Sequence, residues 1–189
     1  MKGKMFIFSA PSGAGKTTIV HNLLKKMPFL EFSVSATSRP IRINETDGKD
    51  YYFLTVEDFK QKIANQEFIE WEEVYKNRFY GTLKSEVNRI WDKGNHVVFD
   101  VDVVGGLNIR RLYPNEALSV FVMPPSIEEL EKRLRLRSSD TKEDIEIRVA
   151  KAKHELEYAN QFDVIILNDK LEKAIAIAEN TVLQFIQKK

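Results

Sequence analysis

The sequence predicts an α/β protein with a parallel sheet flanked by helices. Two observations support this fold class. Four short, continuous apolar segments, at residues 5–9, 96–102, 117–123 and 162–168, are typical of strands buried on both faces of a sheet. Segments with helical periodicity lie between them, and strands that alternate with helices in this way form parallel sheets.

The first strand leads through a loop into a helix. Residues 5–9 (MFIFS) form the strand, and apolar residues at helical spacing from Ile19 to Met27 predict a helix that Pro28 ends. Residues 10–17 between them read APSGAGKT. This matches the phosphate-binding pattern G-x-x-x-x-G-K-[ST], except that Ala10 replaces its first glycine.

The chemistry of such a loop explains its composition. Backbone N–H groups surround phosphate oxygens, Lys16 adds a positive charge, and the Thr17 hydroxyl is a ligand for Mg²⁺. Gly13 and Gly15 stand where the backbone must bend tightly. We expect Ala10 to be tolerated, because a negative φ accepts a methyl group there. The strand and the helix argue against the alternative, a glycine-rich turn with a surface lysine.

Residues 33–95 have shorter and more polar elements, which predict an antiparallel subdomain inserted into the parallel core. The candidate elements are strands at residues 32–38, 50–55 and 67–75, a helix opened by the capping box Thr55-x-x-Asp58 and ending near Asn65, and a helix from about Lys84 to a C-cap at Gly94.

The core pattern returns after residue 95. Ser126-x-x-Glu129 and Thr141-x-x-Asp144 predict the starts of two helices, the second of which extends to about Asn160. The last strand, at residues 162–168, is followed by a closing helix from about Leu171. Each element therefore fits one layered α/β core with an insertion.

Composition excludes several classes of function. The 189 residues carry a net charge of +1, so we expect no nucleic acid and no membrane as partners. There are no cysteines, which excludes disulfides, thiolate zinc sites and cysteine nucleophiles. No apolar segment approaches the ~18 residues of a membrane span, and the N-terminal apolar run is shorter than that of a signal peptide. We expect a cytoplasmic protein.

Several motifs follow one another along the chain: SAPSGAGKTT, SATSRPIR, GKDYYF, EFIEWEEV with RFYGT, FDVDVVGG, MPPS and IILND. In this order they resemble the guanylate kinase family over nearly the whole chain. The resemblance implies transfer of the γ-phosphoryl group of ATP to GMP, giving ADP and GDP, with Mg²⁺, in purine nucleotide metabolism. It also implies a nucleoside-monophosphate kinase fold, with a phosphate-loop core (1–32, 96–130 and 158–189), a GMP-binding subdomain (33–95) and a helical lid (131–157).

The resemblance assigns roles to individual residues. The ATP site comprises Ala10, Pro11, Ser12, Gly13, Ala14, Gly15, Lys16, Thr17, Thr18 and Asn168. The GMP site comprises Arg39, Arg42, Tyr51 and Tyr80 for the phosphate, and Ser35, Glu70, Thr82 and Asp102 for the base. Arg133, Arg137 and Arg148 are lid arginines that act in catalysis together with Lys16, Arg39 and Arg42. One departure is Val104, where the family has a polar residue, which leaves the division of work between Asp100 and Asp102 open.

The chemistry of the residues agrees with these roles. A carboxylate such as Glu70 or Asp102 can accept the N1–H and the N2 amine of guanine together, whereas adenine would leave it unpaired. Asp100 ends a buried strand, at the sheet edge where α/β proteins bind ligands, and we assign it to Mg²⁺ together with Thr17. Phe68, Ile69 and Trp71 are expected in the core.

Less specific interpretations stay open for some residues. Arg39 and Arg42 would suit a solvated loop as well as a phosphate site. Arg133 and Arg137 share a helix face and could simply pair with nearby acidic residues, and Glu70 could face outward from its strand.

Two other functions compete with a guanylate kinase. A non-catalytic protein-binding module of this fold would have lost the phosphate loop, which this chain retains. A kinase for AMP, UMP or dTMP would not need the carboxylates that suit guanine.

Overall fold

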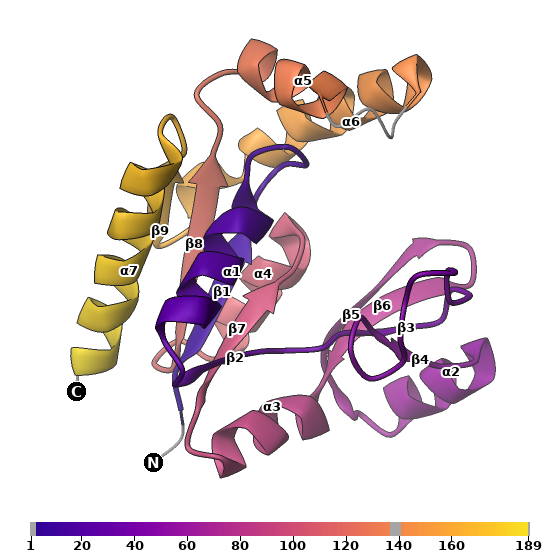
Figure 1. The fold of residues 1–189 in the computed structure, drawn as a ribbon. Coiled ribbons are helices and arrows are strands. Elements are labelled where there is room, and N and C mark those ends of the chain that lie inside the picture. The colour runs from indigo at the N-terminus through magenta and orange to yellow at the C-terminus, as the bar shows by residue number, and fades with distance from the viewer. Residues whose placement is uncertain (1–2, 137–140, 189) are drawn as a thin grey trace.

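The computed structural model describes residues 3–136 and 141–188. The core is a five-stranded sheet in the order β2-β7-β1-β8-β9, and its strand pairs are all parallel. Helices cover both faces of the sheet (Figure 1). The predicted α/β fold class is confirmed.

The strands of the core are β1 (Met5–Ser9), β2 (Leu30–Phe32), β7 (His96–Asp100), β8 (Ala117–Met123) and β9 (Val164–Leu167). Those of a second sheet are β3 (Ala36–Thr37), β4 (Tyr52–Phe53), β5 (Phe68–Tyr75) and β6 (Arg78–Leu83). The α-helices are α1 (Lys16–Lys26), α2 (Val56–Ala64), α3 (Lys84–Asp92), α4 (Val103–Leu112), α5 (Ile127–Leu136), α6 (Lys142–Leu156) and α7 (Leu171–Gln187).

Residues 5–8 of strand β1 are all apolar because helices lie on both of its sides. Phe6 and Phe8 pack with side chains of α1 and α7, whereas Met5 and Ile7 pack with side chains of α3 and α4. Successive side chains of a strand point to opposite faces, so both faces of β1 must be apolar. The strand is thereby fixed between two layers, and the loop that follows it starts from a rigid base.

The sequence predicts that the last strand, β9, is buried on both faces, but one of its faces is exposed. It pairs only with β8, at the edge of the sheet, and Ile165 and Leu167 are 42% and 46% exposed. An apolar run alone does not distinguish a central strand from an edge strand. Ile166, which points to the other face, is buried beside α7.

The segment 32–38 is two strands and not one. Its first residue ends β2 in the core sheet, and residues 36–37 form β3 in the second sheet, so the chain crosses between the sheets at residues 33–35 (Figure 1). Ser33 still donates its N–H to Val98 in the core, and Val34 donates to Glu86 of α3. Alternation of period two predicted extended backbone but not the change of sheet.

The second sheet has the order β4-β3-β6-β5 and is mixed. Its β3–β6 and β5–β6 pairs are antiparallel, but β3 and β4 are parallel, so the prediction of an antiparallel sheet is wrong for that pair. Helix α2 packs against the sheet through Phe59, which stacks on Phe68. Helix α3 connects the two sheets. It follows β6 of the second sheet, and its Val87 and Ile90 pack against one face of the core sheet.

Capping signals set the helix boundaries as predicted. Thr55 and Thr141 accept hydrogen bonds from the third residue of α2 and α6, and Ser126 does the same for α5. Gly94, just beyond α3, has φ +78°. Helix α6 ends at Leu156 and not near Asn160, and a short 3₁₀ turn at Ala159–Gln161 follows it.

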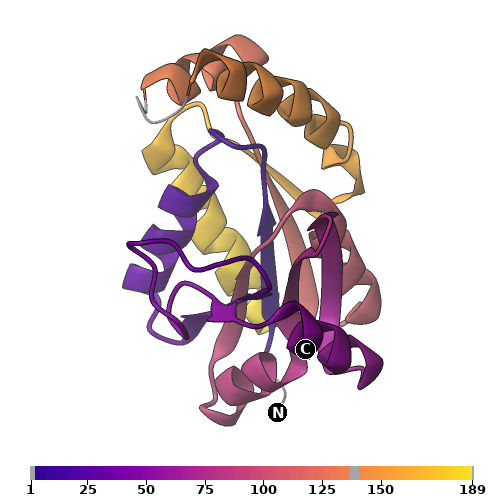
Figure 2. The ribbon, with the colours of Figure 1, turned by 90° about the vertical axis from the view of Figure 1, so that its right-hand side faces the viewer.

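Helices α5 and α6 lie over the end of the core sheet at which the loop leaves β1 (Figures 1 and 2). The second sheet stands to one side of the core sheet (Figure 1). Within the described residues, none of the helices is both long and apolar enough to cross a bilayer.

Candidate functional site

The loop between β1 and α1 has the backbone of a phosphate-binding loop. Gly13 and Gly15 both have φ +91°, in the region that favours glycine. A Cβ on Gly15 would lie 2.3 Å from the side-chain nitrogen of Asn168. Among the described non-glycine residues, positive φ occurs only at Gln66 and Asn77, so Ala10 has the φ expected for a tolerated alanine.

Asn168 supports this loop from the far end of the chain. It follows β9, is almost fully buried, and donates from its side-chain amide to the carbonyl oxygen of Ala14 at 2.7 Å. The main-chain N–H of Asn168 donates to Met123 at the end of β8. Asn168 therefore joins the main chain of the loop to the end of β8.

A cavity of about 370 Å³ opens over the loop. The lining residues are Ala10, Pro11, Ser12, Gly13, Gly15, Lys16, Thr17, Asp100, Val101, Asp102, Arg148, Lys151 and Glu155. Ala14 is buried and Thr18 is exposed, and neither lines this cavity. Lys16 pairs with Asp100 at the end of β7, which holds its ammonium group at the floor of the cavity.

A second cavity, of about 260 Å³, lies between the two sheets. It is lined by Ser35, Tyr51, Glu70, Glu72, Val74, Tyr80, Gly81, Asp100, Val101 and Asp102. Residues 100–102 line both cavities. The two cavities therefore meet at the segment that joins β7 to α4.

Carboxylates dominate the second cavity. Thr82 donates its hydroxyl to Oε1 of Glu70 at 2.8 Å, and Asp102 caps α4 by accepting from the N–H of Gly105 at 2.7 Å. A Cβ on Gly105 would lie 3.1 Å from Glu70 and 3.2 Å from Asp102, so both carboxylates approach this glycine. Such a group of acceptors suits a ligand that presents N–H donors.

Burial raises the pKa of Glu70 to about 7, and the negative charge of Asp102 acts in the same direction. A hydrogen bond with Asp102, followed by burial, raises the pKa of Glu72 to about 7 as well. The raised pKa values of Glu70 and Glu72 therefore favour protonated carboxyl groups in this cavity up to about neutral pH.

The two predicted phosphate arginines have different surroundings in this structure. Arg39 is buried and makes a forked pair with Glu45, with Nη1 2.6 Å from Oε2, and its guanidinium lies 5.0 Å from the centre of the Tyr51 ring. This pair lowers the pKa of Glu45 to about 2. The main-chain N–H of Arg42 also donates to Glu45, but the Arg42 side chain is exposed. Tyr51 and Tyr80 face each other in the second cavity, with ring centres 6.1 Å apart.

The predicted lid arginines differ in their contacts. Arg148 on α6 donates to the Ser12 hydroxyl at 3.0 Å, which joins α6 to the loop between β1 and α1. Arg133 on α5 pairs with Glu129 at 3.1 Å and donates to the carbonyl oxygen of Asn168 at 3.2 Å. Arg137 lies outside the described residues.

The donor set suits Mg²⁺ in the manner of a nucleotide kinase. Within the described part of the chain, no group of three or more His, Cys, Asp or Glu side chains could hold a metal ion. Mg²⁺ in such enzymes is held by one or two protein oxygens together with phosphate oxygens and water. The Thr17 hydroxyl and the Asp100 carboxylate, which line the same cavity, match that pattern.

Sequence reasoning missed four charged residues at or beside the site: Glu45, Glu72, Lys151 and Glu155. Glu72 stands two residues from Glu70 on the same strand, so period-two alternation could have indicated a shared face. Lys151 and Glu155 follow Arg148 at helical spacing and could have been found in the same way. The pairing of Glu45 with Arg39 depends on the path of a loop and has no such signal.

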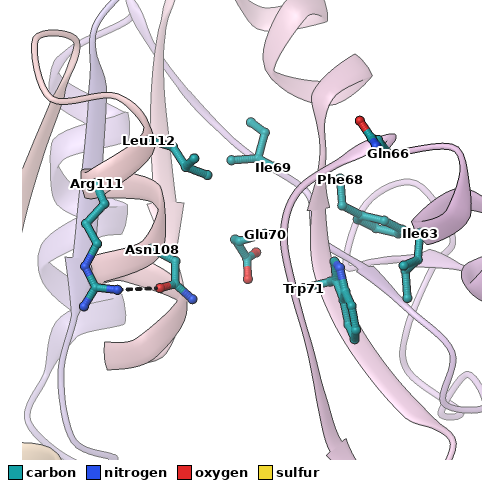
Figure 3. Close-up of a pocket in the computed structure, with 9 residues that line it drawn as sticks. All are labelled: Ile63, Gln66, Phe68, Ile69, Glu70, Trp71, Asn108, Arg111 and Leu112. Carbon is teal, nitrogen blue, oxygen red and sulfur yellow. Dashed lines mark hydrogen bonds between the residues drawn. The ribbon is translucent and has the colours of Figure 1, made fainter.

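Another cavity, of about 470 Å³, lies on another side of Glu70 (Figure 3). Asn108, Arg111 and Leu112 of α4 lie on one side of Ile69 and Glu70, and Phe68 and Trp71 of the second sheet lie on the other side (Figure 3). Trp71 is 45% exposed, so its predicted place in the core is wrong, whereas Phe68 and Ile69 are buried as predicted.

Comparison with known proteins agrees with this geometry. The family model described as guanylate kinase matches residues 2–185. A guanylate kinase of Bacteroides thetaiotaomicron is 54% identical over 188 residues, which cover 100% of this chain and 92% of the relative. A guanylate kinase of Porphyromonas gingivalis is 48% identical over 98% of this chain and 99% of the relative.

A solved structure is also similar. The crystal structure of guanylate kinase from Anaplasma phagocytophilum has a TM-score of 0.78 and 30% sequence identity, and the match covers 100% of this chain and 88% of that one. Fold, loop and whole-length sequence similarity thus agree, and this chain belongs to the guanylate kinase family.

Proposed function

We propose that this chain transfers the γ-phosphoryl group of ATP to GMP, giving ADP and GDP, with Mg²⁺ as its metal cofactor. The observation that carries the proposal is the meeting of two cavities at residues 100–102, one over the phosphate loop and one lined by carboxylates. Phosphoryl transfer needs two nucleotides held in line in adjacent sites, and this arrangement supplies them.

The donor nucleotide binds over the loop. Backbone N–H groups of residues 10–18 and the N-terminus of α1 surround the phosphates, and Lys16 exchanges its pairing with Asp100 for contact with the β- and γ-phosphates. Thr17 and Asp100 would hold Mg²⁺, which neutralises charge on the phosphates when bound. Asn168 keeps the loop in shape and lies near the donor base.

The acceptor nucleotide binds in the second cavity. Glu70, with Thr82 beside it, and Asp102 accept hydrogen bonds from guanine, and Ser35 contacts the base. Tyr51 and Tyr80 bind the phosphate of GMP. Arg39 and Arg42 bind the same phosphate after Arg39 exchanges Glu45 for it, because phosphate offers the same forked geometry as a carboxylate.

Charge compensation during transfer comes from arginines on several sides. Arg148 already contacts the loop through Ser12, and we propose that Arg133 and Arg137 close on the transferring group with it. In this proposal residues 131–157 are the lid, residues 33–95 the GMP-binding subdomain, and residues 1–32, 96–130 and 158–189 the core. The reducing compartment that a chain without cysteines fits is the cytoplasm, where we propose that the protein acts.

The first experiment is an assay of ADP release with Mg²⁺-ATP and each of GMP, AMP, UMP and dTMP. We expect strong turnover with GMP alone, because the acceptors Glu70 and Asp102 suit only a base with N–H donors at these positions. Turnover with another nucleotide would contradict the assignment of the base pocket. Folded protein without turnover on any acceptor would favour a non-catalytic module.

A further inference from the structure

Three cations among the described residues line the cavity over the phosphate loop: Lys16, Arg148 and Lys151. Two of them have close partners there, since Lys16 pairs with Asp100 and Arg148 donates to Ser12. Lys151 is different. Its ammonium lies 3.6 Å from Oε1 of Glu155, beyond hydrogen-bond length, and its side chain is 64% exposed.

Lys151 also lines a fourth, smaller cavity of about 130 Å³. This cavity contains Glu72 and Asp102 from the acceptor side, together with residues of α6. The same lysine therefore borders the donor cavity and the carboxylates of the acceptor cavity. It stands on the side of α6 that faces the place where the two substrates meet.

The charges around Lys151 leave it available for a stronger partner. Burial raises the pKa of Glu155, and the positive charge of Lys151, together with a long hydrogen-bond contact from its ammonium group, counteracts this rise. Lys151 likewise lowers the pKa of Glu72, against the larger effects of Asp102 and burial. The Lys151 ammonium group is attracted by two carboxylates but has no close hydrogen bond to Glu155. It therefore loses little interaction energy when a phosphate replaces the carboxylates as its partner.

We propose that Lys151 is a further phosphate-binding residue of the transfer site. Its ammonium leaves Glu155 and donates to phosphoryl oxygens of the bound nucleotides. The inference rests on the proposed function, since the phosphates are those of the donor and the acceptor. The helix provides the placement: Lys151 follows Arg148 by three residues, so both lie near one face, toward the loop.

The test compares K151A, K151M and K151R with the wild-type protein, and Lys153 provides a matched control. Lys153 is exposed on the same helix, about 200° around its axis from Lys151, and lines neither cavity. Each variant is assayed for kcat and KM with Mg²⁺-ATP and GMP. ATP binding without turnover is measured by calorimetry at two salt concentrations.

We expect K151A and K151M to lower kcat/KM by about 10- to 100-fold, the usual effect of losing a charge-assisted hydrogen bond. K151R should recover most of this loss, and K153A should stay within about twofold of the wild type. K151M retains the apolar stem, so it isolates the charge if K151A unfolds. ATP affinity should depend less on salt in both uncharged variants.

Activity of K151A and K151M within about twofold of the wild type, with unchanged ATP affinity, would overturn the inference. So would an equal loss in K153A, which would indicate a general effect of charge on α6. Failure of the proposed function looks different, because the wild-type protein itself would then lack turnover with GMP. In that case the comparison of ATP binding between wild type and K151M still tests the role of Lys151.

Discussion

The side-chain amide of Asn168 donates a hydrogen bond to the carbonyl oxygen of Ala14, which lies 154 residues earlier in the chain. This contact connects the end of the last core strand to the middle of the phosphate loop. We expect N168A to destabilise the protein by about 1–3 kcal/mol, because the Ala14 carbonyl would lose its partner in a buried place. Urea unfolding measures this change.

The same substitution should raise KM for ATP, because the loop would lose its support. The neighbouring Asp169 is exposed, and D169N serves as the control, with stability and KM close to those of the wild type. An N168A variant with unchanged KM for ATP would show that the loop keeps its shape without this contact.

Gly15 should not tolerate a side chain. G15A would place a methyl group 2.3 Å from the Asn168 amide, at a backbone φ of +91° that costs an alanine about 1 kcal/mol. We expect loss of ATP binding, measured by calorimetry. G94A separates the two effects, because Gly94 has φ +78° but no atom within 4 Å of an added Cβ. It should lose some stability and retain ATP affinity.

Lys16 should be essential for transfer and dispensable for folding. K16A is expected to reduce kcat by at least about 100-fold, because it removes a preorganised charge at the phosphates. Circular dichroism should be unchanged. K25A, on the exposed part of the same helix, is the control for helix α1. Retained turnover in K16A would contradict the assignment of the loop as the donor site.

The raised pKa of Glu70 predicts that stability depends on pH. The folded protein retains the Glu70 proton up to about pH 7, whereas the carboxyl group in the unfolded chain releases it near pH 4.5. The folded state therefore binds more protons between these values, and this contribution to stability falls as pH rises through the window. Relative to E70Q, the free energy of unfolding of the wild-type protein should fall by on the order of 1–3 kcal/mol between pH 5 and pH 8.

Urea unfolding at four pH values, with E73Q on the exposed part of the same strand as control, measures this difference. Parallel curves for wild type and E70Q would contradict the prediction. The assay has a matching expectation: KM for GMP should rise below about pH 7, because the protonated carboxyl group cannot accept both donors of guanine.

The second sheet should move toward the core when both nucleotides bind, because closure excludes water from the transfer site. The chain has no cysteine, so labels can be attached at Q61C on α2 and K173C on α7. We expect the distance between the two labels to shorten when GMP and a non-hydrolysable ATP analogue are bound. A K25C and K173C pair, both in the core, should not change. An unchanged first distance would contradict closure.

Local signals made much of the fold predictable. The apolar run of β1, the loop sequence and the three capping residues Thr55, Ser126 and Thr141 each depend on neighbours within a few residues. The change of sheet at residues 33–35, the exposed edge of β9 and the exposed Trp71 depend on which distant segments pack nearby. The spacing of apolar residues along the chain carries no information about which distant segments pack together.

The residues of the site also divide into those that a local motif predicts and those that depend on the path of distant segments. Residues of the phosphate loop follow from one contiguous motif, and the structure gives them the backbone that the motif requires. The pairing of Arg39 with Glu45 could not be predicted, because it depends on the path of the loop after β3. Lys151 was missed because a lysine on a charged helix resembles any other solvated residue.

Because the segment Asp100–Asp102 borders both cavities, we expect the affinities for the two nucleotides to be interdependent. If ATP at the loop draws Lys16 away from Asp100, the carboxylates that we propose to bind guanine experience a different field. By thermodynamic linkage, whatever factor ATP applies to the affinity for GMP, GMP applies to the affinity for ATP. A substitution in this short segment should therefore alter the coupling free energy between the substrates as well as either binding constant alone.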